Sequence, residues 1–209
     1  MPRGIEYCDS RLKRRWDVAV ASGSLPATSP LWLAMYCYNK LRGQPLFFKQ
    51  ERIGKDNQKF LMIKFETLYK GAENDGYQSK AIHLPHLEKE RCDPRTTSKI
   101  LALMRRSGLN EIPQLINVLK GEMSIVGPRP LPPYVIQEVE EMFPELVRHW
   151  TEVALRVKPG MVGTSPLITR NLPVEQFEQT ALTDIKYVET ATFFGDLSIM
   201  AQAIIATTK

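Results

Sequence analysis

The clearest periodic pattern in the chain lies between residues 110 and 121. Four apolar residues there follow the spacing i, i+3, i+4 and i+7, which places them on one face of a helix: Ile112, Leu115, Ile116 and Leu119. Asn110 is a favourable N-cap and Gly121 a favourable C-terminal stop. Pro113 is tolerated because first-turn backbone donors have no helical partner. The pattern therefore predicts a helix over 110–121.

Two apolar runs before this helix predict a β-hairpin. Residues 45–50 and 60–65 are rich in aromatic and branched side chains, and residues 54–57 between them read Gly-Lys-Asp-Asn. Glycine, aspartate and asparagine favour turns. We expect two short strands joined at this turn.

Residues 18–38 contain no charged side chain, but their centre is rich in helix-breaking residues. Pro26 and Pro30 lie there, and proline kinks or ends a helix. Basic residues flank both ends, which favours placing both ends on the same, cytoplasmic side of a membrane. We expect two half-length helical arms, forming either a re-entrant hairpin in one leaflet or a buried helical hairpin of a soluble protein.

The remaining pattern completes a mixed α/β (α+β) fold. Residues 70–92 are polar and aperiodic and predict an irregular loop. The other expected elements are a helix around 100–106, a strand at 124–126, a helix over 134–150 bent at Pro144, a loop and strand over 155–167, and a helix over 194–205. We expect residues 1–42 to form a basic segment with a membrane-associated helix, and residues 43–209 to form a small α/β domain.

Composition narrows the class of partner. The chain has 209 residues, a net charge of +5 and a pI near 9.1, which favours anionic partners. No basic run carries interleaved aromatic residues, so a nucleic-acid-binding module is disfavoured. Three widely spaced cysteines indicate neither a disulfide framework nor a zinc site, which fits a reducing environment.

Several charged residues are candidates for phosphate chemistry, which needs cations around the phosphates. Arg129 lies between two prolines that restrict its backbone, although a surface arginine in a turn is the simpler interpretation. Arg105 and Arg106 precede the predicted helix start, where an anion is favoured, or they end the previous helix as solvated charges. Glu111 suits a Mg²⁺ site, or only the helix dipole. Lys64 points into a pocket or to solvent.

The chain resembles the monotopic phosphoglycosyl transferases of the bacterial sugar transferase family over nearly its whole length. The matching segments are residues 13–17, 29–30, 45–54, 60–67, 93–95, 110–130, 158–160 and 184–188. The resemblance implies a re-entrant membrane helix at the cytoplasmic face of the bacterial inner membrane, Mg²⁺ as cofactor, and, over residues 43–209, a small cytosolic α/β catalytic-type domain with amphipathic interfacial helices. The oligomeric state is left open, with a homodimer as one alternative. It also implies transfer of a sugar 1-phosphate from a UDP-sugar to polyprenyl (undecaprenyl) phosphate, with release of UMP.

The resemblance assigns roles residue by residue. Glu111 aligns with the metal-binding glutamate, Arg105 and Arg129 with phosphate-binding arginines, and Lys64 with the strand lysine. Arg106 and Asp184 are assigned with them to substrate binding. The sequence also departs from the family pattern at Glu66, where arginine is usual, and in the run 161–166.

The nucleophile of the family, an aspartate, aligns with Asn110. A neutral amide cannot form the acyl phosphate that covalent transfer requires. Three hypotheses follow: an active transferase that uses an altered nucleophile or direct transfer, a catalytically silent homologue that binds a UDP-sugar or a partner transferase, and a substitution made at position 110 to trap a substrate.

Overall fold

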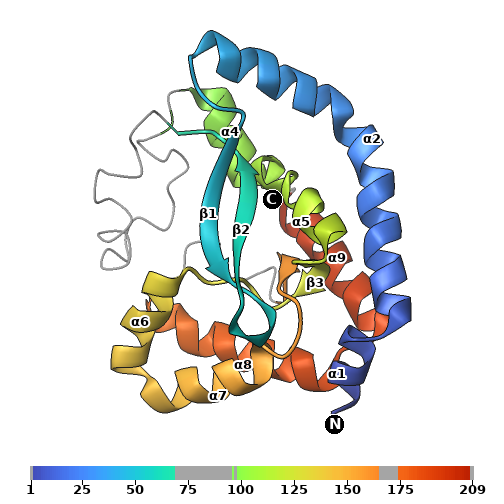
Figure 1. The fold of residues 1–209 in the computed structure, drawn as a ribbon, viewed down its shortest axis with the longest axis vertical. Helices are drawn as coiled ribbons and strands as arrows, with labels where there is room; N and C mark the ends of the chain where they lie inside the picture. The colour runs from blue at the N-terminus through green and yellow to red at the C-terminus, as the bar shows by residue number, and fades with distance from the viewer. Residues whose placement is uncertain (1, 69–95, 97, 165–173, 208–209) are drawn as a thin grey trace.

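The structure, a computed structural model, describes residues 2–68, 96, 98–164 and 174–207. Two small sheets lie among helices (Figure 1). Strands β1 (Phe47–Ile53) and β2 (Lys59–Phe65) pair antiparallel, whereas β3 (Ser124–Gly127) and β4 (Gly160–Gly163) pair parallel. The mixed α/β prediction is confirmed.

The predicted hairpin is confirmed, with β1 shifted a few residues toward the turn. A 3₁₀ turn, η1 (Lys55–Asn57), joins the strands. Asp56 and Asn57 take φ values of 53° and 60° there, and short polar side chains tolerate this left-handed region. Phe48 pairs with Lys64 and Arg52 with Phe60, so alternation places Arg52 and Lys64 on the same face of the hairpin.

The helix predicted over 110–121 is shorter than expected. Helix α4 (Lys99–Ser107) ends at Gly108, whose φ of 75° turns the chain into a 3₁₀ turn, η4 (Leu109–Glu111). Helix α5 (Gln114–Lys120) begins only after Pro113. The prediction of Asn110 as N-cap was wrong, because Asn110 lies inside η4. The expected stop at Gly121 is confirmed by its φ of 84°.

A helical connection joins the two parallel strands, as parallel pairing requires. Its helices are α6 (Pro133–Met142) and α7 (Pro144–Ala154). The predicted bend at Pro144 is therefore a complete break. The two strands approach closely: a Cβ on Gly127 would lie 2.6 Å from the Lys158 carbonyl oxygen. Only glycine fits there, which explains why the chain needs Gly127 beside the 158–160 segment.

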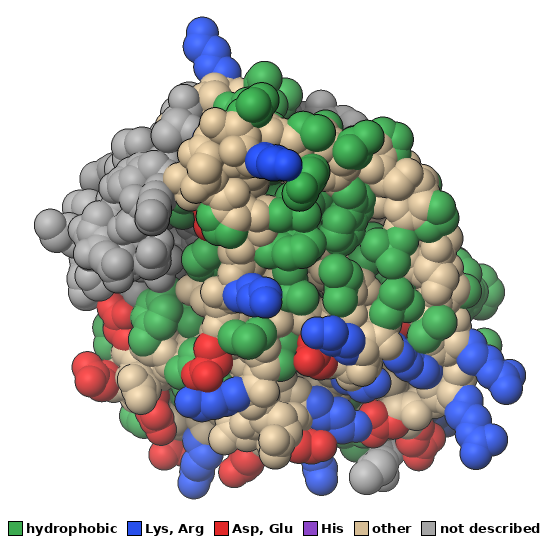
Figure 2. Space-filling view, turned by 45° about the horizontal axis from the view of Figure 1, so that its top comes forward, with side chains coloured by type: hydrophobic (Ala, Val, Ile, Leu, Met, Phe, Trp, Pro, Cys, Tyr) green, Lys and Arg blue, Asp and Glu red, His purple; other side chains and the backbone are tan. Residues whose placement is uncertain are grey.

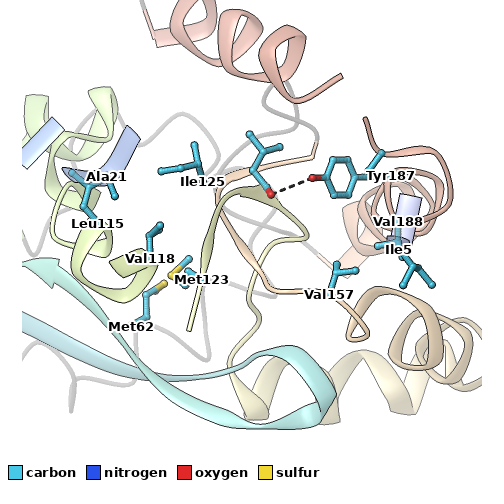
Figure 3. Packing of buried hydrophobic residues seen from close by; sticks show 12 residues of the cluster. Ile5, Ala21, Met62, Leu115, Val118, Met123, Ile125, Val157, Tyr187 and Val188 are labelled. Carbon is cyan, nitrogen blue, oxygen red and sulfur yellow. Dashed lines mark hydrogen bonds between the residues drawn. The ribbon is translucent and has the colours of Figure 1, made fainter. Parts of the chain in front are cut away.

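Two C-terminal helices cover the strands. Helix α9 (Phe193–Thr207) matches the expected last helix, whereas α8 (Val174–Thr190) was not predicted. Buried residues of α5, β3 and α8 meet in the main core, where the Tyr187 hydroxyl donates to the Val126 carbonyl oxygen at 3.2 Å (Figure 3). On the other side of α8, Phe177 packs edge-on against Trp150 of α7, with ring centroids 6.1 Å apart.

The apolar N-terminal segment is one helix, α2 (Arg11–Leu41), with Pro26 and Pro30 inside it. The two-armed hairpin prediction was wrong: the prolines leave a continuous helix that curves along one side of the molecule and over its top (Figure 1). The Thr28 hydroxyl donates to the carbonyl oxygens of Ser24 and Leu25, at 2.9 and 3.2 Å, in this part of the helix. Among the described residues, no helix combines the length and hydropathy that a membrane span needs.

A buried ionic cluster fixes the base of α2. The Lys13 ammonium lies 3.2 Å from an Asp17 carboxylate oxygen and 2.7 Å from one of Asp196 on α9. Asp196 also accepts hydrogen bonds from the hydroxyls of Tyr7, on helix α1 (Arg3–Cys8), and Tyr187. All three charged side chains of the cluster are at least 97% buried, with exposed fractions of 3%, 2% and 0%. Lys13 is therefore a core residue and not a charge facing lipid headgroups.

The cluster reaches the strand that leads to Arg129. Asp17 accepts a hydrogen bond from the backbone N–H of Ile125 in β3, at 3.1 Å. Arg14 donates to the carbonyl oxygens of Val118 and Leu119, at 2.6 and 2.8 Å, which satisfies the C-terminal end of α5. The basic motif at the start of α2 thus attaches this helix to the strands and helix around the candidate site.

Candidate active site

A narrow pocket opens between the β1–β2 hairpin, η4 and the turn after β3. Its charged lining residues are Arg52, Lys64, Glu111 and Arg129. The uncharged lining comes from Met62, Gln114, Pro130, Gly160, Met161 and Gly163. The pocket has an empty volume of about 290 Å³, part of which is open to solvent. Three of the predicted site residues, far apart in sequence, therefore meet here with Arg52.

Lys64 and Glu111 form an ion pair at the pocket wall. The Lys64 ammonium lies 2.9 Å from a Glu111 carboxylate oxygen, and the two side chains are 17% and 18% exposed. Burial, together with the nearby charges of Arg52 and Arg129, lowers the pKa of Lys64 to about 8, while Glu111 opposes the shift. The lysine is thus on the pocket side of β2, which answers the question that strand alternation left open.

Arg129 follows β3 directly and projects into the same pocket. The glycines at 127 and 160 let the two strands approach, and the amide N–H of Gly160 donates to the Pro128 carbonyl oxygen at 2.8 Å. The turn that carries Arg129 is therefore held by both prolines and by the backbone of β4, so little entropy is lost when its guanidinium binds an anion.

Arg52 was not among the predicted site residues. Its guanidinium donates to the Pro130 carbonyl oxygen at 3.0 Å and to Gln50 Oε1 at 2.6 Å. Burial, with a smaller contribution from Arg129, lowers the pKa of Arg52 to about 10. The strand alternation that places Arg52 on the face of Lys64 could have identified it.

Asp184 does not line the pocket but lies behind Arg129. It is 1% exposed, and its carboxylate accepts hydrogen bonds from Trp150 Nε1 at 3.0 Å and from the Thr164 hydroxyl at 2.5 Å. Burial raises the pKa of Asp184 to about 6, while hydrogen bonds from Thr164, Trp150 and the backbone of Arg129 oppose the shift. Asp184 thus supports the Arg129 turn from the core, whereas direct contact with a substrate in this pocket would require it to be exposed.

The raised pKa of Asp184 predicts a pH-dependent stability. An acid whose pKa is higher in the folded state than in the unfolded state gives its stabilising contribution below the unfolded pKa and loses it as pH rises. Between the ordinary value of 3.8 and about 6, we expect wild type to lose about 3 kcal/mol of unfolding free energy relative to Asp184→Asn. Urea denaturation of both proteins from pH 3.5 to 7 measures this difference. A difference that does not change with pH would contradict the expectation.

Asn110 lies next to the pocket in sequence but does not line it. Its side chain is 7% exposed, and its Oδ1 has no hydrogen-bond partner. A buried carbonyl oxygen without a partner costs free energy. The position aligned with the nucleophile therefore holds a side chain whose buried carbonyl oxygen accepts no hydrogen bond from the described residues.

Arg105 and Arg106 occupy the last turn of α4 and do not line the pocket. The Arg105 guanidinium lies 3.5 Å from the hydroxyl of Thr67, just after β2. Both arginines were expected beside the free N–H groups of the next helix. Gly108 and η4 instead separate them from α5.

Glu111 is the one carboxylate among the described lining residues, so we tested whether the pocket suits Mg²⁺. The described residues contain no group of three or more histidine, cysteine or acidic side chains that would form an all-protein metal cage. Mg²⁺ needs no such cage, because it commonly binds one or two carboxylates, water and substrate phosphates. A single carboxylate beside three cations fits a metal that arrives with a phosphate ligand.

Known proteins are similar in sequence to this chain over most of its length. The sequence profile of the bacterial sugar transferases matches residues 8–209. The exopolysaccharide production protein ExoY of Rhizobium meliloti is 33% identical over 199 residues, covering 92% of this chain and 83% of that protein. The uncharacterized sugar transferase EpsL of Bacillus subtilis is 34% identical over 194 residues, covering 92% and 85%. The UDP-glucose:undecaprenyl-phosphate glucose-1-phosphate transferase of Escherichia coli is 31% identical over 193 residues, covering 90% and 38%. The chain belongs to the bacterial sugar transferase family.

Proposed function

We propose that the chain is a phosphoglycosyl transferase that binds a UDP-sugar and passes its sugar 1-phosphate to undecaprenyl phosphate, releasing UMP. The single observation that carries this proposal is the convergence of Arg52, Lys64 and Arg129 around Glu111 in one pocket. Such a lining has a net positive charge and matches the diphosphate of a sugar nucleotide. The names of relatives that act on undecaprenyl phosphate support the acceptor.

Each pocket residue has a definable role in this reaction. Arg129 and Lys64 bind phosphate oxygens and stabilise the negative charge that develops as the phosphoryl group moves. Glu111, which contacts Lys64 in this structure, would hold Mg²⁺, and the metal would supply positive charge to the phosphates. The reaction breaks the bond between the β-phosphorus and the oxygen that bridges to the α-phosphorus, and this oxygen leaves with UMP.

The experiment that tests the proposal is UMP release from a panel of UDP-sugars with undecaprenyl phosphate and Mg²⁺. We expect binding and release to fall at least tenfold in Arg129→Gln and Lys64→Gln, because each loses a charge-assisted hydrogen bond. Arg148→Gln is the matched control, since Arg148 is 69% exposed and forms an ion pair with Glu145 on α7, away from the pocket lining. A panel in which no UDP-sugar binds and no UMP appears would reject the proposal.

A second candidate function is a catalytically silent homologue that binds a UDP-sugar or a partner transferase. The observation that favours it is Asn110, whose amide replaces the aligned carboxylate. Both candidates share the same pocket and differ only in turnover. Restoring the carboxylate at this position separates them.

We further propose that the C-terminal half of α2 lies in the membrane interface at the cytoplasmic face. Leu33, Tyr36 and Leu41 are 65%, 49% and 88% exposed there, and the Lys40 ammonium lies 5.6 Å from the Tyr36 ring centroid. Hydrophobic side chains gather on the upper part of the molecule, with lysines and arginines around them (Figure 2). An apolar surface bordered by cations suits an anionic lipid surface.

Charged substitutions on α2 test this membrane contact. We expect Leu33→Glu combined with Leu41→Glu to reduce binding to anionic vesicles more than tenfold, because burying each leucine contributes about 1.5–3 kcal/mol. Leu182→Glu is the control, since Leu182 is 54% exposed but lies on α8. Vesicle co-sedimentation measures the binding. Equal sedimentation of the double variant and wild type would exclude this face.

A further inference from the structure

Arg52 carries a positive charge that the fold itself does not neutralise. Its two hydrogen-bond acceptors, the Pro130 carbonyl oxygen and Gln50 Oε1, are both neutral. No carboxylate in the described part of the chain forms an ion pair with it. Its Nε is buried without a hydrogen-bond partner. Buried arginines are normally paired, because neutral acceptors satisfy hydrogen bonds but do not compensate the charge.

The surroundings of Arg52 increase this imbalance. Arg129 lines the same pocket and repels it, while Glu111, the carboxylate among the described lining residues, already contacts Lys64 at 2.9 Å. The charged lining therefore consists of three cations and one carboxylate. A pocket with this excess positive charge becomes neutral when it takes a ligand with two negative charges.

We propose that Arg52 and Arg129 together form a phosphate subsite that binds a phosphorylated ligand through the charges of the chain itself, without a metal. This inference rests on the proposed function. In it, the phosphate of the ligand is the counterion that Arg52 lacks among the described residues. The same link from Arg52 to the Pro130 carbonyl oxygen fixes the turn that carries Arg129. A ligand phosphate on this subsite would therefore be held by two guanidinium groups whose positions depend on each other.

Two phosphates of the reaction share this chemistry: the diphosphate of the sugar nucleotide and the monophosphate of the lipid acceptor. UDP and UMP represent the first source, and farnesyl phosphate, a short soluble prenyl phosphate, represents the second. Calorimetric titration of all three compounds, in EDTA and again in Mg²⁺, separates the sources and tests the role of the metal.

The variants separate a ligand-binding role from a structural one. In EDTA, we expect Arg52→Gln to bind UDP or farnesyl phosphate at least tenfold more weakly than wild type. The compound whose binding weakens shows whether the subsite takes the phosphate of the sugar nucleotide or that of the lipid acceptor. Arg52→Lys should recover part of the loss because it keeps the charge but not the planar fork. Gln50→Ala, which removes a neutral acceptor and no charge, should change affinity less than about threefold. Melting temperatures of the ligand-free proteins show whether each variant is folded.

The outcomes distinguish this inference from the proposed function. Weaker binding by folded Arg52→Gln, with Arg148→Gln equal to wild type, supports the subsite. Binding by Arg52→Gln equal to wild type, or binding by wild type only when Mg²⁺ is present, overturns it and leaves the proposed function intact. A wild-type protein that binds none of the three compounds, with or without Mg²⁺, overturns both.

Discussion

Asn110→Asp is expected to raise UMP release from a UDP-sugar by on the order of 100-fold or more, since loss of a nucleophile costs far larger factors in well-studied enzymes. The introduced carboxylate can attack the β-phosphorus, form an acyl phosphate and expel UMP. A phosphate oxygen of the lipid acceptor then displaces the carboxylate and takes the phosphosugar. The native amide cannot complete the first of these steps.

The structure makes this substitution a clean test. Asparagine and aspartate have nearly the same shape, and the change keeps the Oδ1 of Asn110, which has no hydrogen-bond partner among the described residues, and exchanges only the amide nitrogen for an oxygen. The pocket next to it carries excess positive charge, which favours the charged form of a carboxylate. Asn117→Asp is unsuitable as a control, because Asn117 is fully buried and its amide donates to the Leu61 carbonyl oxygen and to Glu122. Asn57→Asp, in the exposed hairpin turn, serves instead.

Three results are informative. UMP release by the variant alone identifies the native chain as a homologue that binds a UDP-sugar but does not form the covalent intermediate. Equal release by both proteins contradicts the expectation and means that position 110 is not the nucleophile. A phosphosugar adduct on Glu111 would also contradict it, although a shift of one helical residue rotates a side chain by about 100°.

Local pattern predicted those parts of the fold that local physics determines. The hairpin, the stop at Gly121 and the break at Pro144 each depend on turn-forming or helix-ending residues whose backbone preferences are strong. The unpredicted helix α8 also had a signal, because Phe177, Ala181, Ile185 and Val188 are buried and recur at helical spacing. This periodicity could have been found.

Other features could not be read from the chain because they depend on tertiary contacts. Lys13 looked like a membrane-flanking charge, since the sequence does not show that Asp196 would lie 2.7 Å from it. The prolines of α2 indicated a broken segment, yet the segment is one helix whose buried residues, among them Ala21 and Met35, lie on both sides of the prolines. Asn110 looked like an N-cap because asparagine is common at that position. The sequence did not show that the 3₁₀ turn η4 would contain Asn110 and delay the start of the helix.

The residues of the candidate site also divide into those that local sequence predicted and those that depend on tertiary contacts. Lys64, Glu111 and Arg129 were found through local motifs and the family resemblance, and the fold brings them together. Strand alternation could have placed Arg52 on the face of Lys64, but its lack of a counterion among the described residues depends on three-dimensional packing. The pocket and α2 are also linked, since Asp17 at the base of α2 accepts a hydrogen bond from the strand that leads to Arg129. The proposed membrane contact of α2 and the proposed phosphate site are therefore connected through the same strand.

Lys13→Met is expected to destabilise the protein by about 3–5 kcal/mol, because it leaves two buried carboxylates without their shared cation. Methionine keeps most of the side-chain volume, so the loss measures charge and not packing. Urea unfolding at pH 7 gives the free energy. The control is Arg148→Met, which breaks an exposed ion pair and should cost at most about 1 kcal/mol.

Adding Asp196→Asn to Lys13→Met tests the electrostatic origin of the loss. The amide removes one of the two unpaired charges, and its carbonyl oxygen still accepts from the hydroxyl of Tyr7 or Tyr187. We therefore expect the double variant to be more stable than Lys13→Met alone, which is a non-additive result of the kind that residues in contact show. A double variant less stable than either single variant would mean that the cluster contributes through hydrogen-bond geometry and not through charge. Because Asp17 accepts a hydrogen bond from Ile125, we also expect the affinity for UDP, measured by calorimetric titration, to fall in Lys13→Met but not in Arg148→Met.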